Sequence, residues 1–448
     1  MLTVLMLLLA VVPLVMGLSL SKRTHSNSVK PIDIGIVFTW VVFLYAFLPL
    51  VGIWLSSQGI GTLADQRLGG VHPDSAIVEA TAQSYAAFML GFAVVYAVTR
   101  RTNFRQLTIT QPPTLADLRN ILLLAVFVKL ASAALLIGFS SNSSGSYIGT
   151  YTALVGQPLL LRQLAGVLSA TDFAASILVI FVIVAYNDKL WQFLFVILIV
   201  NVCISVVGGG SRTNAFLYAF AFFVSRSCYD RRLNSRVLIL YGVIGVALFL
   251  IAGLIRSSFN SSDGSLILQV LQDGEFLSLF YTSMDVLMRT SGVELDALKP
   301  GLYLVDVLRL IPQQIVGGLK TDPATLYVST FYPEFGEAGG GLAFGAIAES
   351  SIGFGWPEAL VRGALVGWLY SSIASRCLGE NFSVIRGFIY VWFVVVSYQS
   401  IRDTTFSTVP RFIIQVIPML VFLRFTGTLA AKRKLWRKPL TLSNDRNI

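Results

Sequence analysis

The sequence predicts an all-α polytopic membrane protein. Of its 448 residues, 55% are hydrophobic and 12% are charged, and the mean hydropathy is +0.75. Soluble globular domains carry about 25% charged residues, so this composition excludes a soluble domain. Runs of roughly 20 apolar residues, the length that crosses a bilayer as a helix, recur along the whole chain.

Taken in order, these runs predict about eleven transmembrane helices. The predicted spans are 2–20, 34–54, 76–98, 120–139, 164–186, 190–207, 213–225, 237–255, 357–375, 384–400 and 412–429. The run at 342–353 is shorter and is expected to be a re-entrant piece. The first span is expected to be retained, because no basic segment precedes it and no small-residue cleavage site follows it.

The distribution of lysine and arginine predicts the orientation. Basic residues gather at 22–30, 100–119, 226–236, 376–386 and 432–438, which are alternate connections between the predicted spans. By the positive-inside rule these segments are cytoplasmic, so the amino terminus lies outside and residues 431–448 form a basic cytoplasmic tail. The net charge of +10 is thereby explained by loops that face anionic lipid, and nucleic acid is not expected as a partner.

One large hydrophilic segment, residues 256–341, divides the chain. It separates eight predicted spans in residues 1–255 from the carboxyl-terminal spans in residues 342–430, and it is expected to face outward. Its ten acidic and five basic residues give it a net charge of −5. Residues 302–312 form an amphipathic segment that could lie along the membrane surface as a lid. Loops of this length are usually functional, so the site is expected at the outer face.

Arginines that the topology does not predict on the cytoplasmic side are the main candidates for residues of a functional site. Arg212 follows three glycines between two apolar runs, where an unpaired guanidinium is costly. Arg289, Arg402 and Arg411 join it, and such a group could hold a diphosphate without a metal ion. Snorkelling at span ends is the simpler interpretation for three others, namely Arg67, Arg162 and Arg256. A structural ion pair with Asp403 is the simpler alternative for Arg402.

Two further charges lie within apolar surroundings. Lys129 falls in the middle of a predicted span, where a cation is usually paired or faces a cavity. Glu349 falls between two apolar runs, so it should face the protein interior and could pair with a nearby arginine. The acidic pairs Glu294/Asp296 and Glu334/Glu337 could hold a metal or supply a general base, although solvated loop charge is the simpler explanation.

Several common kinds of site are excluded or disfavoured. The chain has two histidines, predicted on opposite sides of the membrane, which disfavours a Ser-His-Asp or Cys-His site. Gly208-Gly209-Gly210-Ser211 lacks the lysine and the spacing of a nucleotide-binding loop. No cofactor or metal is therefore expected. The three cysteines have no disulfide or zinc spacing and are expected to pack inertly. The spacings Gly341-x-x-x-Gly345 and Gly363-x-x-x-Gly367 indicate helix packing.

These residues together resemble the Wzy-type oligosaccharide repeat-unit polymerases. The resemblance covers roughly residues 190–425. It is carried by Gly208–Asn214 between two spans, Arg289 in the outer loop, Tyr332-Pro333-Glu334 before the glycine-rich turn at 339–341, and Ile401-Arg402-Asp403 through Pro410-Arg411. The paired arginine motifs with a following glycine that some O-antigen polymerases carry have no clean match here.

The resemblance implies a bacterial inner-membrane glycosyltransferase with a lipid-phosphosugar (GT-C-like) architecture. Such an enzyme joins undecaprenyl-diphosphate-linked oligosaccharides on the periplasmic face, and a membrane protein that regulates chain length is a possible partner. We expect a direct, inverting, metal-independent displacement. The expected roles are diphosphate binding by Arg212, Arg289, Arg402 and Arg411, base catalysis by Glu337, Glu334 or Glu294, and further substrate contacts by Lys129, Asn214, Arg309, Tyr332 and Glu334. Sugar is expected on Tyr303, Tyr327, Phe331, Tyr332 and Phe335.

Two other functions compete with polymerisation. An O-antigen ligase would transfer the finished glycan to a lipid acceptor, but the resemblance implies a histidine in the outer loop of ligases, and residues 256–341 contain none. A transporter of the same lipid-linked glycan would use the arginines for translocation. Such a protein is expected to have repeated halves and broken helices, and the sequence has no evident internal repeat.

Overall fold

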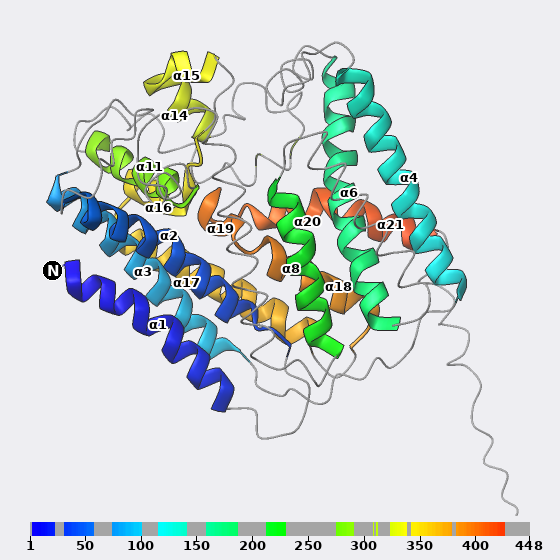
Figure 1. Cartoon of the computed structure of the whole chain (residues 1–448), viewed down its shortest axis with the longest axis horizontal. Helices are drawn as coiled ribbons and strands as arrows, with labels where there is room; N and C mark the ends of the chain where they lie inside the picture. Colours follow the sequence, from blue (N-terminus) through cyan, green and yellow to red (C-terminus); the bar gives the residue numbers. More distant parts are fainter. Residues whose placement is uncertain are drawn as a thin grey trace, which may run out of the picture.

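The computed structural model is helical throughout the part of the chain that it describes (Figure 1). The described residues are 2–22, 31–57, 74–100, 115–140, 158–186, 212–229, 275–290, 308, 311, 323–337, 342–378 and 382–425. The helices before the large hydrophilic segment are α1 (Leu2–Lys22), α2 (Ile34–Ser57), α3 (Ser75–Thr99), α4 (Leu115–Ser140), α6 (Leu159–Tyr186) and α8 (Arg212–Tyr229). Within the segment and after it lie α11 (Glu275–Thr290), α14 (Pro323–Phe331), α15 (Pro333–Glu337), α16 (Gly345–Ile352), α17 (Trp356–Cys377), α18 (Val384–Val396), α19 (Gln399–Arg402), α20 (Thr408–Gln415) and α21 (Ile417–Phe425).

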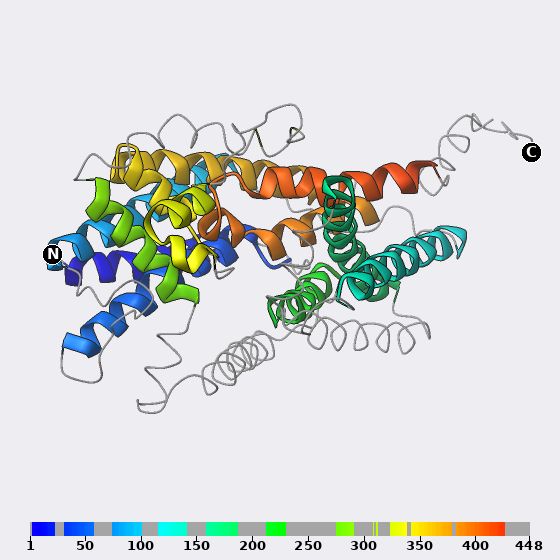
Figure 2. The ribbon, with the colours of Figure 1, turned by 90° about the horizontal axis from the view of Figure 1, so that it is seen from above.

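Helices α1, α2, α3 and α17 run side by side as one half of the bundle (Figure 2). The closest approach is between α3 and α17. A Cβ atom on Gly363 would lie 2.0 Å from the carbonyl oxygen of Phe88, and one on Gly367 would lie 2.6 Å from that of Phe92. Small residues let helix backbones approach in this way. The prediction that this glycine pair packs helices is confirmed, whereas Gly341 lies outside the described residues.

The other half consists of α4, α6 and α8, with α18 and α20 packed against α6 (Figure 1). Aromatic contacts such as the one between Phe173 and Tyr218, with ring centroids 5.5 Å apart, join α6 to α8. Cys228 and Cys377 are buried and unbridged. Cys203 lies outside the described residues.

Five described helices are long and apolar enough to cross a membrane. They cover Ile34–Leu55, Ser75–Thr99, Leu164–Ala185, Val384–Arg402 and Thr408–Phe425. The shorter apolar helix Leu5–Leu18 lies within the predicted span 2–20, and Leu217–Cys228 overlaps the predicted span 213–225. The predicted spans 190–207 and 237–255 fall outside the described residues, so the total of eleven stays a prediction. The helical membrane-protein class agrees with the sequence.

Buried hydrogen bonds and an ion pair join the ends of three helices. The charge distribution predicts that these helix ends lie on the cytoplasmic side of the membrane. Asp33 accepts hydrogen bonds from the backbone N–H of Gly35 at 2.8 Å and from the Tyr96 hydroxyl at 2.8 Å, and it forms an ion pair with Arg100. The Tyr390 hydroxyl donates to the Ile32 carbonyl oxygen at 2.8 Å. The beginnings of α2 and α18 and the end of α3 therefore meet at one end of the bundle, as the predicted topology requires.

Several helices near the opposite end are broken. The eight-residue α16 is too short to cross a bilayer, and all eight of its residues are buried. It begins at Gly345, whose φ of +80° favours glycine. A Cβ there would lie 2.9 Å from the carbonyl oxygen of Ile401, because α19 packs against it. The apolar run 342–353 thus contains a short helix, and its re-entrant position in a membrane stays a prediction.

Helix α11 is part of the bundle, although it belongs to the segment that the sequence assigns to an outer loop. It packs against α2, α3 and α16. Phe276 lies against Tyr45, with ring centroids 4.7 Å apart, and Phe280 stacks on Tyr85 at 5.4 Å. The segment 256–341 therefore contributes a core helix and is not only a surface loop.

Candidate functional site

The first group of candidate residues lies on the turn between α19 and α20. Arg402 ends α19, and Arg411 lies in the first turns of α20. Arg411 Nη2 lies 2.8 Å from Asp403 Oδ2, and the side chains of Arg411 and Asp403 are 37% and 28% exposed. The Arg411 guanidinium is thus partly exposed, where an anionic ligand can reach it, whereas the Nε atom of Arg402 is buried.

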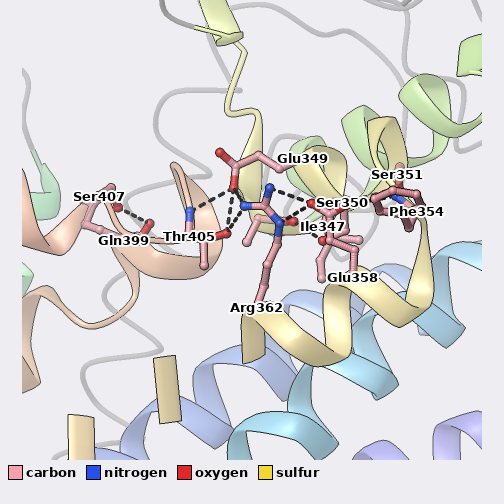
Figure 3. Close-up of polar contacts among 11 residues, drawn as sticks. Ile347, Glu349, Ser350, Ser351, Phe354, Glu358, Arg362, Gln399, Thr405 and Ser407 are labelled. Carbon is pink, nitrogen blue, oxygen red and sulfur yellow. Dashed lines mark hydrogen bonds and ion pairs between the residues drawn. The ribbon is translucent and has the colours of Figure 1, made fainter. Parts of the chain in front are cut away.

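A buried network joins this turn to α16 and α17 (Figure 3). Glu349, on α16, is 1% exposed. Its Oε2 atom accepts hydrogen bonds from the backbone N–H of Thr405 at 3.0 Å, from the Thr405 hydroxyl at 2.7 Å, and from Arg362 Nη1 at 2.7 Å. Arg362 Nη1 also donates to the Thr405 hydroxyl at 2.7 Å. The prediction that Glu349 faces the interior beside an arginine is confirmed.

Glu358 completes the network one helical turn before Arg362 on α17. Its Oε1 atom accepts from Arg362 Nε at 2.7 Å, and its Oε2 atom accepts from the backbone N–H of Phe354 at 2.9 Å. The guanidinium of Arg362 is therefore held between two carboxylates and cannot swing out to a ligand without losing both. Arg362 is a structural residue of the site and not a ligand-binding one.

The second group of candidates surrounds Asp285 and Arg289 on α11. Asp285 Oδ2 accepts hydrogen bonds from the hydroxyls of Tyr327 and Tyr332, the latter at 2.8 Å, and from Arg289 Nε at 3.0 Å. Arg289 Nη2 also donates to the Tyr332 hydroxyl at 3.2 Å. Arg289 and Tyr332, which the sequence analysis names separately as candidate site residues, thus lie in contact, and Asp285 binds both.

Aromatic side chains cover one side of this guanidinium. The Arg289 Cζ atom lies 4.3 Å from the ring centroid of Phe331 and 5.5 Å from that of Tyr332. Burial, and then the hydrogen bond to Asp285, raise the pKa of Tyr332, so its hydroxyl remains a donor. Tyr327 is fully buried. The expectation that Tyr327 contacts sugar is wrong, because its ring is buried and its hydroxyl donates a hydrogen bond to Asp285.

The two groups are near each other but separate. Leu279, on α11, is the nearest side-chain neighbour of Gly345, whose other neighbour is the Ile401 carbonyl oxygen. Arg289 lies ten residues further along α11, which corresponds to about 15 Å of helical rise. The predicted diphosphate site shared by Arg212, Arg289, Arg402 and Arg411 stays a prediction, because nothing is described of the Arg212 side chain.

The remaining predicted site residues are less fully described. Arg212 and Asn214 begin α8, and Glu337 ends α15, but nothing is described of these three side chains. Glu334 is exposed on α15, which agrees with solvated loop charge. Arg309, Glu294, Asp296 and Tyr303 lie outside the described residues, and so do Arg67 and Arg256. Among the side chains that are described, no three acidic, histidine or cysteine residues could share a metal ion.

Lys129 does not join either group. Its Nζ atom lies 2.9 Å from Asp172 Oδ2 on α6, and the two side chains are 21% and 16% exposed. Among the described helices, α4 packs mainly on α6. A charge in the apolar interior of a membrane protein is commonly paired in this way. The expectation that Lys129 contacts substrate is not supported by its contacts, which make it a helix-pairing residue.

This pairing leads to a prediction. Lys129→Met leaves the Asp172 carboxylate without its cation, so it is expected to lower the thermal midpoint of the detergent-solubilised protein and to loosen α4. The exchanged pair Lys129→Asp with Asp172→Lys is expected to recover most of the loss. Cysteine cross-linking between α4 and α6 would follow the contact directly. An exchanged pair no more stable than Lys129→Met would contradict this account.

Asp285 and Thr405 are the residues that the sequence interpretation missed. Asp285 precedes Arg289 by four residues, which places both on one face of a helix. That spacing was the available signal. Thr405 gave no signal, because its partners lie 56 and 43 residues away in the chain.

No protein-family model, curated protein or solved structure matches the chain. The resemblance to repeat-unit polymerases therefore depends on the residues described above.

Proposed function

We propose that this protein is a membrane glycosyltransferase that polymerises oligosaccharide repeat units carried on undecaprenyl diphosphate, at the outer face of a bacterial inner membrane. The observation that carries the proposal is the turn between α19 and α20. This turn has Arg402 and Arg411 on its two short flanking helices, and the buried network of Glu349, Thr405 and Arg362 joins it to α16 and α17. Arginine binds phosphate through two parallel hydrogen bonds and keeps its charge at any accessible pH. A lipid diphosphate carries phosphate groups that arginine can bind in this way, and its lipid anchors it in the membrane.

The reaction would proceed without a nucleotide. The acceptor hydroxyl forms a bond to the anomeric carbon of the donor sugar, and the bond from that carbon to the diphosphate oxygen breaks. Undecaprenyl diphosphate leaves with the electron pair, and the hydroxyl proton passes to a carboxylate such as Glu334 or Glu337, or to water. Arginines placed at the leaving group stabilise the charge that develops there.

The cluster of Asp285, Arg289 and Tyr332 would serve the sugar side of the same reaction. The Arg289 guanidinium is paired with the Asp285 carboxylate. The cluster therefore offers a ligand directional hydrogen bonds more than net positive charge. Phe331 and Tyr332 add apolar ring surface beside those donors. Sugars present hydroxyls on their edges and C–H groups on their faces, which suits such a mixed surface.

The test is polymerisation by the purified protein. In detergent, with a chemically defined undecaprenyl-diphosphate repeat unit, the wild-type protein is expected to produce a ladder of glycans on a gel, with or without EDTA. Arg411→Ala is expected to lose the ladder. Arg424→Ala is the matched control, because this exposed arginine lies in the last turn of α21. A folded wild-type protein that is inert on the cognate unit would refute polymerisation.

A transporter of the same lipid-linked glycan is the second candidate. The broken helices α16, α19 and α20 favour it, because discontinuous helices form the substrate sites of many transporters. Proteoliposomes that carry a fluorescent lipid-linked oligosaccharide distinguish the two. Movement of the label between leaflets with no change in glycan length would support transport, whereas longer glycans would support the polymerase.

A further inference from the structure

The Asp285 carboxylate uses only one of its two oxygens for contacts with the rest of the described chain. Its Oδ2 atom accepts hydrogen bonds from the hydroxyls of Tyr327 and Tyr332 and from Arg289 Nε. Among the described residues, none donates to Oδ1, and the Asp285 side chain is 11% exposed. Three donors on Oδ2 hold the carboxylate in place, so that Oδ1 is oriented to accept a hydrogen bond from a ligand.

Arg289 adds hydrogen-bond donors beside that acceptor. Its Nε atom binds Asp285 and its Nη2 atom binds the Tyr332 hydroxyl, whereas no hydrogen bond of the described residues uses Nη1. The Arg289 side chain is 29% exposed. The rings of Phe331 and Tyr332 lie against the guanidinium and fix its plane. Guanidinium donors lie in that plane, so the Nη1 edge can donate to a ligand that also reaches Asp285.

We propose that Asp285 Oδ1 and Arg289 Nη1 together bind an uncharged sugar of the repeat unit and discriminate against sugars that carry a carboxylate. The proposal rests on the proposed function, since it names the class of sugar that the cluster takes. A sugar hydroxyl both donates and accepts, so neighbouring hydroxyls match an acceptor beside a donor. A carboxylate only accepts. It would leave Asp285 Oδ1 without a donor and would lie close to a group of its own charge.

The charges in and around the cluster also disfavour an anionic sugar. Arg289 and Asp285 form an ion pair at 3.0 Å, so their opposite charges offset each other. Glu334, two residues after Tyr332, is exposed on α15. The segment 256–341, which contains the cluster, has ten acidic and five basic residues. An anionic sugar would therefore approach a surface of its own sign, whereas an uncharged sugar would not be repelled.

A glycan array measures this preference without polymerisation. The probes are uncharged hexose and N-acetylhexosamine oligosaccharides beside the corresponding uronic-acid oligosaccharides, and the full chain is applied in detergent with a fluorescent label. The wild-type protein is expected to bind the uronic-acid glycans about tenfold more weakly than their uncharged counterparts. Asp285→Asn retains the shape and leaves the Arg289 charge unpaired, so it is expected to raise the ratio of acidic to uncharged binding about tenfold. Arg289→Gln leaves the carboxylate unpaired and is expected to lower that ratio.

Opposite shifts in the two variants separate a ligand contact from loss of structure, because a partly unfolded protein binds both kinds of glycan less in the same proportion. Asp74→Asn is the matched control, since it makes the same chemical change at the exposed N-cap of α3, where asparagine also caps a helix. A wild-type protein that binds no uncharged glycan, or that prefers uronic-acid glycans, would overturn the proposal. An unchanged ratio in Asp285→Asn would do the same.

The gel assay of polymerisation shows which of the two proposals fails. If the ratio shifts as expected and no ladder forms on the cognate repeat unit, the cluster binds an uncharged sugar in a protein that is not a polymerase. If a ladder forms and the ratio does not shift, polymerisation stands, and only the assignment of Asp285 and Arg289 to an uncharged sugar is wrong.

Discussion

Arg362→Met is expected to lower the free energy of unfolding by about 3–5 kcal/mol, the typical cost of removing one partner from a buried ion pair. The Arg362 and Glu349 side chains are 10% and 1% exposed, so water cannot replace the lost guanidinium. Methionine keeps much of the side-chain volume, which limits the effect of an empty space. The measurement is unfolding in mild detergent by titration with a denaturing detergent, followed by tryptophan fluorescence.

The double variant Glu349→Gln with Arg362→Met separates charge from packing. It removes the Glu349 charge together with the guanidinium, and only Glu358 still loses its partner, so it is expected to be more stable than Arg362→Met alone. Arg424→Met, at an exposed arginine of α21, is the control for loss of a guanidinium as such, and it is expected to change stability by less than about 0.5 kcal/mol. A double variant as unstable as the single one would show that packing, and not the unpaired carboxylate, dominates.

The buried network illustrates what the sequence could and could not predict. Glu349 lies between apolar runs, and an ionised side chain there requires a partner, so both its inward direction and an arginine partner could be inferred. That Thr405 is the third residue of the network could not be inferred from the sequence. It depends on where the turn after α19 approaches α16, and that is a result of packing between segments far apart in the chain.

Helix breaks were predictable where the backbone itself causes them. Pro418 occupies the second position of α21 and has no N–H to donate, which explains why α20 and α21 separate near Val416. The break after Val396 has no proline or glycine at it. There, the Tyr370 hydroxyl, on α17, donates to the Ser397 carbonyl oxygen at 3.1 Å and lies 2.8 Å from the Ser400 hydroxyl. The Ser397 hydroxyl donates to the Val394 carbonyl oxygen at the end of α18. The sequence predicts one continuous span over 384–400 for that reason.

The charges around α11 and its helical periodicity lead to opposite predictions. The segment around it is acidic and hydrophilic, which predicts an outer loop. Within α11, however, Leu277, Phe280 and Met284 recur at helical spacing and are buried. The same helix carries Asp285 and Arg289 at its end, so recognising it as a packed helix would also have predicted their contact.

Arg289→Ala is expected to slow polymerisation about 10–10²-fold, because it removes a charged hydrogen-bond donor to the sugar, which contributes about 1.5–3 kcal/mol. Arg289→Lys is expected to restore little of the rate, because an ammonium group has no planar face to lie on Phe331 and no fork to bind Asp285 and Tyr332 together. The rate of glycan elongation on the defined lipid-linked repeat unit measures both variants. Arg424→Lys, remote from the cluster, serves as the matched substitution.

Asp285→Asn and Tyr332→Phe distinguish a contact made by Arg289 itself from a merely structural role of the cluster. Asp285→Asn retains the shape but weakens the hydrogen bonds that aim the guanidinium, so it is expected to lower the rate by about tenfold or more with a smaller loss of stability. Tyr332→Phe retains the ring beside Arg289 and removes one acceptor, and its effect is expected to be smaller. The raised pKa of Tyr332 keeps the phenol protonated at neutral and mildly alkaline pH, so its titration should not lower the wild-type rate there. If Arg289→Lys were as active as the wild type, the geometry of the guanidinium would have no role in the reaction, and a diffuse positive charge would be enough.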